Sequence, residues 1–250
     1  MSLLKVENLS KHFGSLIAVD TVSMTVEPGE LRAVIGPNGA GKTTFFNMIS
    51  GFLTQTSGKI VFDGEDISDL SPARRVWRGI ARTFQITEVF PELSVRENLR
   101  IAVETASGLR LSPWLSAERD KEIRARIDEL LGMGGLSGKA NRLVGEMSHG
   151  DQRACEIMMA LALKPRLLLL DEPTAGMGDQ ETYDITQLIR RLHRDEKLTI
   201  VLIEHDMRVV FHLADRILVL AEGKMLAEGT PQEIASNEAV QAAYLGKAAA

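Results

Sequence analysis

The stretch GPNGAGKTT at residues 36–44 combines three glycines with a lysine and two threonines. The apolar run before it, 31–35, predicts a short buried strand, and the apolar spacing after it predicts a helix over 43–50 that Gly51 ends. Glycines let a tight loop turn its backbone N–H groups inward, and a helix N-terminus carries partial positive charge. The spacing G-x-x-x-x-G-K-[ST] between a strand and a helix therefore predicts a loop that holds the phosphates of a nucleoside triphosphate.

The side chains of this loop fit a nucleotide bound together with magnesium. Lys42 would reach the outer phosphates, and the hydroxyl of Thr43 would ligate Mg²⁺. A glycine-rich turn without a ligand is the competing interpretation, which we disfavour because the whole motif is present. The loop residues assigned to ATP are Gly36, Pro37, Asn38, Gly39, Ala40, Gly41, Lys42, Thr43 and Thr44.

A second predicted strand, 167–170, ends in two carboxylates, Asp171 and Glu172, within LLLLDEP. An Asp at the carboxyl end of a buried strand beside a phosphate loop is positioned to hold the Mg²⁺ shell, often through water. Glu172 lies one residue nearer the terminal phosphate, where it could polarise the attacking water as a general base. A pair of solvated strand-end carboxylates is the alternative, and the phosphate loop makes it the weaker one.

His205 and Gln85 complete the candidate residues of the core. His205 comes just after the apolar run in IVLIEHD, so it could contact the γ-phosphate and orient the water. Gln85 in RTFQ follows another short strand. A glutamine there could sense Mg²⁺ or water and couple the nucleotide state to movement of the segment after it. Without the other motifs, His205 would be an ordinary strand-end histidine and Gln85 a solvated loop residue.

Composition narrows the setting of this chemistry. The 250 residues could form one domain with an insertion or two small domains, and a hydrophobic share of 44% is enough for a sizeable core. The net charge of −5 argues against a nucleic-acid binder held by a broad positive field. No apolar stretch approaches the roughly 18 residues of a membrane helix, and the N-terminus lacks the layout of a signal peptide. We expect a soluble cytoplasmic protein whose single cysteine, Cys155, is buried in a helix.

Strand and helix patterns divide the chain into a core and an insertion. Apolar runs alternate with helical spacing, which indicates an α/β core. Strand-like alternation over 19–26 adds a β part with one solvated face. Ser94 opens a helix of the middle region with a capping box. We expect a core of residues 1–87 and 148–250, with a helical subdomain over about 88–147.

The stretch MSHGDQR at 147–153 offers a second place for an anion. Ser148 supplies a hydroxyl and Gly150 a free N–H group, and both precede an apolar helix whose N-terminus favours negative charge. One chain has no need of two triphosphate-binding loops for one nucleotide, but two chains that face each other could each close the other's site. This stretch therefore predicts a dimer with two shared ATP sites.

Five elements now stand along the chain: the phosphate loop, Gln85, MSHGDQR, LLLLDEP and His205. Together and in this order, they resemble the motifs of the ATP-binding subunit of ABC transporters, and the resemblance covers nearly the whole chain. The resemblance identifies residues 36–43 as Walker A, Gln85 as the Q-loop, 147–152 as the signature, 167–172 as Walker B and His205 as the H-loop. It implies a P-loop NTPase fold of the α/β class, an ABC ATPase core with an antiparallel β part and a helical subdomain. The whole chain would form a single ABC ATPase domain.

The resemblance also implies the remaining roles. Phe13 in KHFGSLIAV would stack on adenine, although a core phenylalanine is the other interpretation. The implied contacts are Ser148, Gly150 and Asp151 for the nucleotide of the facing chain, Thr43, Gln85 and Asp171 for Mg²⁺, and Glu172, His205 and Gln85 for catalysis.

Finer similarity points to one branch of the family. RTFQITEVFPELSVRENL, DEPTAGM, EHDM and the ending AEGTPQEI…AVQAAYLG look like ATPases of the branched-chain (hydrophobic) amino-acid uptake group, which has relatives that serve urea and short amides. Two departures affect the expected contacts. The signature has Met147, His149 and Asp151 in place of three common residues, and Gly178 followed by Asp179 stands where the family commonly has Asp or Asn. The second departure leaves the contact of this loop with the facing chain open.

We therefore expect the ATP-hydrolysing subunit of an importer for branched-chain or hydrophobic amino acids, at the cytoplasmic face of the cell membrane. The implied partners are two membrane-spanning permease subunits, an identical or paralogous ATPase chain and, indirectly, an extracytoplasmic solute-binding protein, but no nucleic acid. Residues 86–98, with Val89, Phe90 and Leu93 as exposed apolar candidates, would dock the permease. An importer ATPase for urea or short amides is the first alternative, and a soluble ABC ATPase of DNA repair or translation is the second. Export stays open in principle, because importers and exporters share this type of ATPase subunit.

Overall fold

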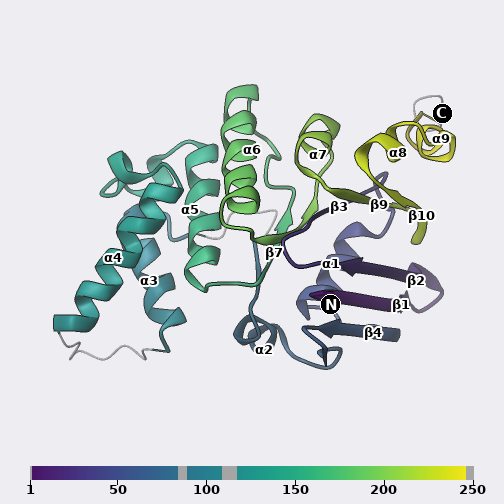
Figure 1. Ribbon diagram of the computed structural model, residues 1–250, viewed down its shortest axis with the longest axis horizontal. Coiled ribbons are helices and arrows are strands. Elements are labelled where there is room, and N and C mark those ends of the chain that lie inside the picture. The colour runs from purple at the N-terminus through teal and green to yellow at the C-terminus, as the bar shows by residue number, and fades with distance from the viewer. Residues whose placement is uncertain (1, 84–88, 109–116, 246–250) are drawn as a thin grey trace.

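Two hydrogen-bonded sheets of different strand direction form the scaffold (Figure 1). The computed structural model describes residues 2–83, 89–108 and 117–245. The first sheet is antiparallel, in the order β2-β1-β4-β5. Its strands are β1 (Leu4–Phe13), β2 (Leu16–Val26), β4 (Ser57–Phe62) and β5 (Glu65–Asp66).

The second sheet has the order β10-β9-β3-β8-β7-β6 and is parallel from β9 to β6, with β10 antiparallel at its edge. Every residue of β3, β7 and β8 is buried, the pattern of parallel strands covered on both faces. The predicted α/β core is confirmed. The strands are β3 (Leu31–Ile35), β6 (Ile80–Arg82), β7 (Leu167–Asp171), β8 (Thr199–Ile203), β9 (Arg216–Ala221) and β10 (Lys224–Gly229).

Helices cover the second sheet and extend the molecule to one side. Figure 1 shows α5 and α6 beside β7, and α3 with α4 on the far side of α5, away from the antiparallel sheet. The capping box predicted at Ser94 is confirmed at the start of α3. The helices are α1 (Lys42–Ser50), α2 (Pro72–Trp77), α3 (Val95–Ala106), α4 (Ala117–Met133), α5 (His149–Ala162), α6 (Asp179–Arg194), α7 (Met207–Leu213), α8 (Pro231–Ala235) and α9 (Glu238–Leu245), with 3-10 turns at Ser137–Lys139 and Val144–Glu146.

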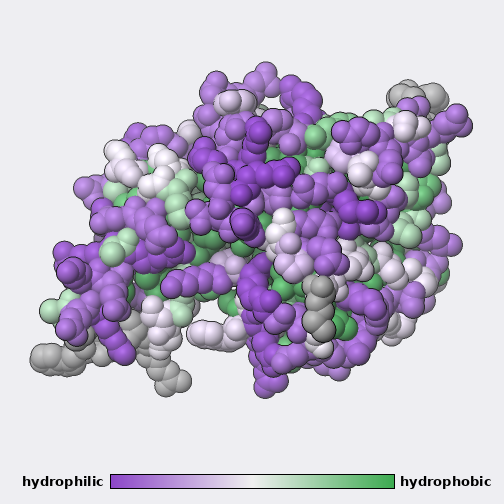
Figure 2. Space-filling view, in the orientation of Figure 1, coloured by the Kyte–Doolittle hydropathy of each residue, from purple (hydrophilic) through white to green (hydrophobic). Residues whose placement is uncertain are grey.

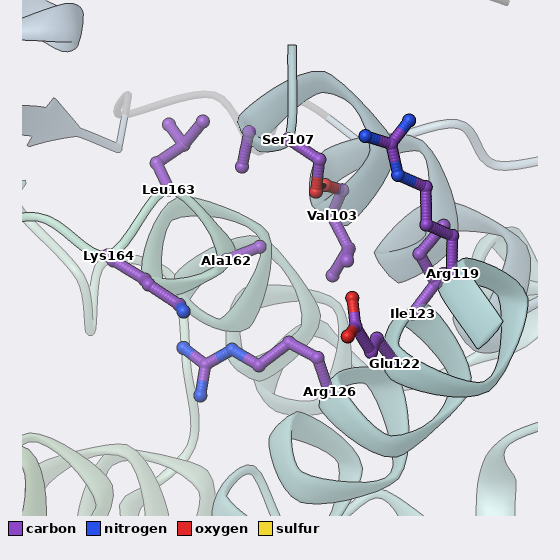
Figure 3. Close-up of a pocket in the computed structure, with 10 residues that line it drawn as sticks. Val103, Ser107, Arg119, Glu122, Ile123, Arg126, Ala162, Leu163 and Lys164 are labelled. Atoms are coloured by element: carbon purple, nitrogen blue, oxygen red, sulfur yellow. Dashed lines mark hydrogen bonds between the residues drawn. The ribbon is translucent and has the colours of Figure 1, made fainter. Parts of the chain in front are cut away.

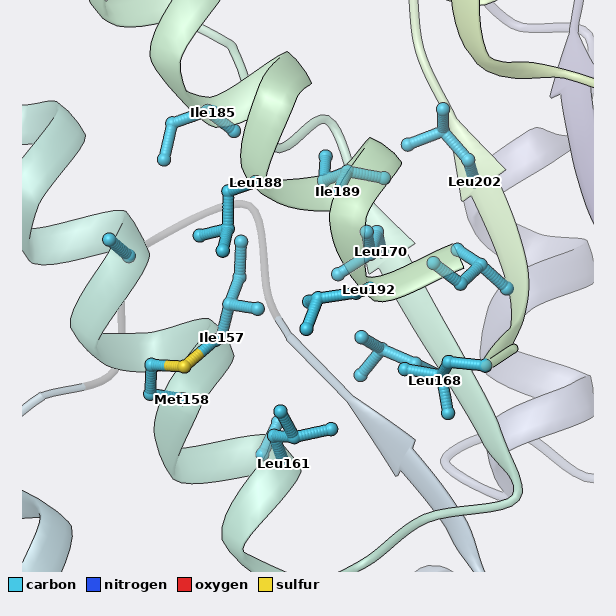
Figure 4. Packing of buried hydrophobic residues seen from close by; sticks show 14 of the residues in the cluster. Ile157, Met158, Leu161, Leu168, Leu170, Ile185, Leu188, Ile189, Leu192 and Leu202 are labelled. Carbon is cyan, nitrogen blue, oxygen red and sulfur yellow. The ribbon is translucent and has the colours of Figure 1, made fainter. Parts of the chain in front are cut away.

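Alternate residues of the parallel strands face two different apolar cores, because successive side chains of a strand point to opposite faces. On β7, Leu168 and Leu170 face the core shared with α5 and α6, whereas Leu167 and Leu169 face α1 and the antiparallel sheet. Figure 4 shows side chains of α5 and α6 meeting those of β7, with Leu192 close to the strand. The sheet is therefore fixed between two packed layers.

The strand β2 begins earlier than the sequence predicted. The alternating pattern started at Val19, but β2 pairs with β1 as far as Leu16, opposite Phe13. Leu16 and Ile17 are 64% and 48% exposed. Because these apolar side chains are not buried, the usual alternation of a half-buried strand is missing at this end.

The surface is mostly hydrophilic on the face shown in Figure 2, where hydrophobic residues show mainly in the recesses between elements. No helix in the described ranges is both long and apolar enough to cross a membrane. Cys155 is buried in α5, as predicted, and burial raises the pKa of its thiol to about 12. This thiol is therefore a packing group rather than a nucleophile.

Arg75 of α2 fixes the end of α1, the helix that follows the phosphate loop. Its guanidinium is buried and donates to the carbonyls of Met48 at 2.6 Å, Ile49 at 2.7 Å, Ser68 at 2.8 Å and Leu70 at 2.9 Å. Burial lowers its pKa to about 10. The last carbonyls of a helix lack partners within the helix, and here a buried side chain supplies them.

We predict that Arg75→Met lowers the free energy of unfolding by about 3 kcal/mol, because four carbonyl groups each lose the hydrogen bond from this buried guanidinium. Urea unfolding without nucleotide measures this loss. Arg74→Met, on the same helix but exposed, should change the free energy by less than about 0.5 kcal/mol. Equal losses in the two variants would contradict the role given to Arg75.

Candidate nucleotide site

The phosphate loop connects the buried end of β3 to the N-terminus of α1. Gly41 has a φ of 95°, and a Cβ atom there would lie 2.4 Å from the carbonyl oxygen of Ala18, so only glycine fits. In the described structure no side chain caps the N-terminus of α1. Lys42 is buried and donates from Nζ to the carbonyls of Gly36 at 2.8 Å and Pro37 at 3.1 Å. The loop thus surrounds its own lysine and leaves a helix N-terminus for an anion.

A cavity of about 580 Å³ opens over this loop. Its lining joins the loop residues from Asn38 to Thr44 with the β1–β2 hairpin, the β9–β10 turn and two catalytic candidates, Glu172 and His205. Phe13 lies at its hairpin side and is 48% exposed, so it is not a core residue. The cavity has the size of a small-ligand site, with an aromatic ring on one side and a phosphate-type loop on the other.

Glu172 and His205 meet in this cavity. Nε2 of His205 lies 2.7 Å from Oε1 of Glu172. The two residues follow β7 and β8, which pair so that Asp171 lies opposite Ile203. Glu172 has a φ of 46°, a left-handed conformation that is uncommon outside glycine, and its N–H donates to the carbonyl of Ile203. Backbone strain of this kind is typical of functional sites.

The residues predicted to hold Mg²⁺ offer the oxygen donors that this ion prefers. Thr43 lines the cavity, and Asp171 is buried at the end of β7. Nη2 of Arg82 lies 2.8 Å from Oδ2 of Asp171, so a buried cation neutralises this carboxylate. Within the described ranges no group of three or more His, Cys, Asp or Glu side chains is arranged to hold a metal ion. Gln85, the third predicted ligand, lies outside the described residues.

The signature residues lie in a different cavity of the same chain, one of about 560 Å³ between α5 and α6. The hydroxyl of Ser148 caps α5 by accepting from the N–H of Asp151 at 3.3 Å. Both carboxylate oxygens of Asp151 accept hydrogen bonds from Nζ of Lys139, each at 2.6 Å. None of the residues that line this cavity also lines the cavity over the phosphate loop. A single chain therefore keeps apart the two helix N-termini that the sequence predicts to bind anions.

Glu204 is a buried carboxylate that the sequence analysis did not select. It accepts from the N–H of Thr174 at 3.1 Å, from the Thr174 hydroxyl, and from the N–H groups of His205 at 2.7 Å and Asp206 at 3.3 Å. It therefore ties the loop after β7 to the loop after β8, and fixes the backbone that presents Glu172 and His205. The signal in the sequence is a carboxylate that ends an apolar run directly before a candidate histidine.

A further cavity, of about 350 Å³, lies between α3, α4 and the end of α5 (Figure 3). Its polar lining mixes charges of both signs, with Arg119, Glu122, Arg126 and Lys164 around an apolar floor. It contains none of the predicted site residues. The candidate chemistry is therefore at the phosphate loop and not in this cavity.

Two family models match the chain. One, described as ABC transporter, matches residues 19–175, and the other, described as branched-chain amino acid ATP-binding cassette transporter, matches residues 224–250. The high-affinity branched-chain amino acid transport ATP-binding proteins BraF of Pseudomonas aeruginosa and LivG of Escherichia coli are 39% and 40% identical to it, with 98% of each chain covered. The lipopolysaccharide export system ATP-binding protein LptB of Haemophilus influenzae is 38% identical, covering 99% of this chain and 98% of its own.

Solved structures are similar over nearly the same length. The ADP conformation of MJ1267, an ATP-binding cassette of an ABC transporter, has a TM-score of 0.86 and 30% identity, with 98% of this chain and 99% of that chain covered. A dimeric post-hydrolysis state of the cassette MJ0796, bound to ADP and Pi, has a TM-score of 0.76 and 28% identity, covering 91% and 98%.

Proposed function

The chain belongs to the ABC transporter family of ATP-binding proteins, and we propose that it is the ATP-hydrolysing subunit of an importer for branched-chain amino acids. The observation that carries the mechanism is the cavity in which the phosphate loop, Glu172 and His205 face one another. The match of residues 224–250 to a branched-chain amino acid cassette family supports branched-chain amino acids as the transported solutes. The names of BraF and LivG, at 39% and 40% identity, support the same assignment.

ATP would lie in this cavity, with its adenine on Phe13 and its phosphates along the loop from Gly36 to Thr44. Lys42, held by loop carbonyls, would turn its ammonium group to the outer phosphates. Glu172 would take a proton from the attacking water, and the 2.7 Å contact with His205 would hold its carboxylate in place. Bound Mg²⁺ would neutralise phosphate charge. Its proposed ligands are Thr43, Gln85 and Asp171.

We infer that two ATPase chains close around two nucleotides. In this arrangement Ser148, Gly150 and Asp151 of one chain contact the nucleotide bound to the other. The separate position of the signature cavity supports this proposal, because these residues line no part of the cavity over their own phosphate loop. A related cassette that was solved as a dimer supports it further. The second chain is either a copy of this one or a paralogue.

A helical subdomain of about residues 88–147, set into a core of 1–87 and 148–250, would carry the contact with two permease subunits. Phe90 supports this, since its ring is 47% exposed while its backbone N–H and carbonyl bond to the buried amide of Asn98 at 2.8 and 3.0 Å. A rigidly presented exposed aromatic ring is typical of a docking site. Val89 and Leu93, both expected to be exposed, are half-buried. Val89 packs against the core, so it does not belong to this surface.

The protein would then lie at the cytoplasmic face of the cell membrane, bound through the permease, with an extracytoplasmic binding protein delivering the solute. Import of urea or short amides is the alternative cargo. The export protein LptB is nearly as similar as the amino-acid relatives, so overall identity does not separate the branches. The family match at 224–250 favours branched-chain amino acids. A soluble ABC ATPase of DNA repair or translation is the weaker alternative.

Glu172→Gln should keep ATP binding but reduce turnover by at least about 10²-fold, because an amide cannot take the proton of the attacking water. The variant should then accumulate as a dimer with ATP and Mg²⁺, which size-exclusion chromatography with light scattering detects. Glu222→Gln removes another carboxylate from the lining of the same cavity and should leave turnover within about twofold. A Glu172→Gln chain that stays monomeric would rule out the closed homodimer.

Phe90→Asp should abolish solute uptake in cells, because a charge replaces the apolar ring at the proposed docking surface. ATPase activity of the isolated subunit should change less than about twofold, since Phe90 lines no part of the nucleotide cavity. Met225→Asp, at an exposed apolar residue of β10, is the matched control and should leave uptake unchanged. Normal uptake with Phe90→Asp would disprove this docking surface.

Disruption of this subunit should reduce uptake of labelled leucine, with isoleucine and valine as competitors for the same carrier, and should leave uptake of labelled urea unchanged. Re-expression of the chain should restore leucine uptake, and re-expression of Lys42→Ala should not. Loss of urea uptake alone would select the alternative cargo. If both rates stay normal while uptake of another solute falls, the cargo assignment is wrong and the ATPase mechanism stands.

A further inference from the structure

The signature helix α5 already holds an anion, and that anion belongs to its own chain. Glu181, in the first turn of α6, accepts from the backbone N–H of Gly150 at 3.2 Å through Oε1, and the Ser148 side chain lies beside the same carboxylate. The hydrogen bond from Gly150 and, after it, the nearby Ser148 side chain lower the pKa of Glu181. The carboxylate therefore stays ionised at the N-terminus of α5, where partial positive charge favours it.

Close packing of α5 on α6 holds Glu181 in this position. A Cβ atom on Gly150 would lie 3.2 Å from Cβ and 3.3 Å from Cγ of Glu181. The missing side chain at residue 150 thus lets the stem of Glu181 lie directly on the backbone of the signature turn. Because the stem is held by packing, its carboxylate is directed at the Gly150 N–H rather than at solvent.

Neighbouring charges leave Glu181 as the carboxylate that faces these donors. Asp151, also in the first turn of α5, has both oxygens on Nζ of Lys139 at 2.6 Å. His149 lies close enough to add to the lowering of the Glu181 pKa. The charges around Ser148 and Gly150 are therefore arranged to attract one negative group, which in this structure is Glu181.

We propose that Glu181 determines how strongly the assembled site depends on the third phosphate of the nucleotide. In the free subunit its carboxylate accepts from the Gly150 N–H and lies beside the Ser148 hydroxyl. These are the two donors that bind the γ-phosphate of the partner's ATP in the closed dimer. This inference rests on the proposed function, because it requires the two-chain ATP site.

Closure of the dimer then exchanges one anion for another at the same helix N-terminus. The γ-phosphate of ATP replaces the carboxylate, so the two donors keep a charged partner, and Glu181 moves towards solvent. ADP has no third phosphate to replace it, so Glu181 stays and its charge opposes the approach of the partner's nucleotide. Glu181 thereby disfavours closure on ADP more than closure on ATP.

The test compares dimer formation in the Glu172→Gln background, where hydrolysis does not remove the ATP. Adding Glu181→Ala should lower the dimer dissociation constant with ATP and Mg²⁺ by about tenfold, because the donors no longer have to be freed of a charged partner. With ADP and Mg²⁺, a dimer should become measurable. Adding Glu181→Gln, which keeps a neutral acceptor, should give a smaller change in the same direction. Sedimentation velocity over a range of protein concentrations measures all of these constants.

Asp184→Ala supplies the matched control. Asp184 lies on the same helix and lines the same cavity, so its removal changes the net charge equally without touching the Gly150 N–H. It should shift the dissociation constant by less than about twofold. Thermal unfolding of each monomer checks that the variants are folded.

The outcomes separate this inference from the proposed function. If the Glu172→Gln chain itself forms no dimer with ATP, the two-chain site fails and the role of Glu181 fails with it. If that chain forms a dimer and Glu181→Ala leaves it unchanged or weaker, the role of Glu181 alone is overturned. An equal gain in the Asp184→Ala control would also overturn it, because general charge repulsion would then explain the effect.

Discussion

The parallel hydrogen bonding of β3, β8 and β7 is the constraint on which the site depends. Val34 and Asp171 both lie opposite Ile203, so the three strands end at one edge of the sheet. The phosphate loop, Glu172 and His205 all come within two residues of these ends and therefore share one cavity. A shift of one residue in this register would turn Asp171 to the opposite face of the sheet, because side chains alternate along a strand.

Strand pairing brings the loops at this edge of the sheet together, and buried charged side chains then hold them in place. Arg82 joins β6 to β7 through Asp171, and its other contacts reach Asn47 and Ser50 on α1. Glu204 joins the loops after β7 and β8. Removing one partner of such a buried set leaves the other without compensation, which costs more than a surface pair would. Arg82 and Glu204, which have no part in the proposed reaction, thus hold the geometry of the groups that do.

The sequence predicted the elements and motifs that have a local sequence pattern. It did not predict the contacts that form only when distant segments pack together. Spacing alone located β3, the phosphate loop, α1 and the carboxylates after β7, because each has a short-range signature. Glu204 was missed because two of its four donors, the N–H and the hydroxyl of Thr174, come near it only when the strands pair. The contact of Glu181 with Gly150 joins residues 31 positions apart and exists only because α5 packs on α6. Val89 was wrongly expected at the surface, because an apolar residue in a loop looks the same in sequence whether it is exposed or packed.

The segment 224–250, which a branched-chain family model matches, lies close to the phosphate loop. An importer subunit and an exporter subunit are almost equally similar to this chain, so overall identity does not indicate the cargo. The segment matched by the branched-chain family begins at β10 and includes α9, where Tyr244 packs against the core with its hydroxyl near the backbone of Gly36. Burial raises the pKa of this tyrosine to about 12, so it remains a neutral phenol at the start of the phosphate loop. The segment that the branched-chain family matches therefore lies close to the start of the phosphate loop, so a change in this segment can reach the loop without any change in the proposed catalytic residues.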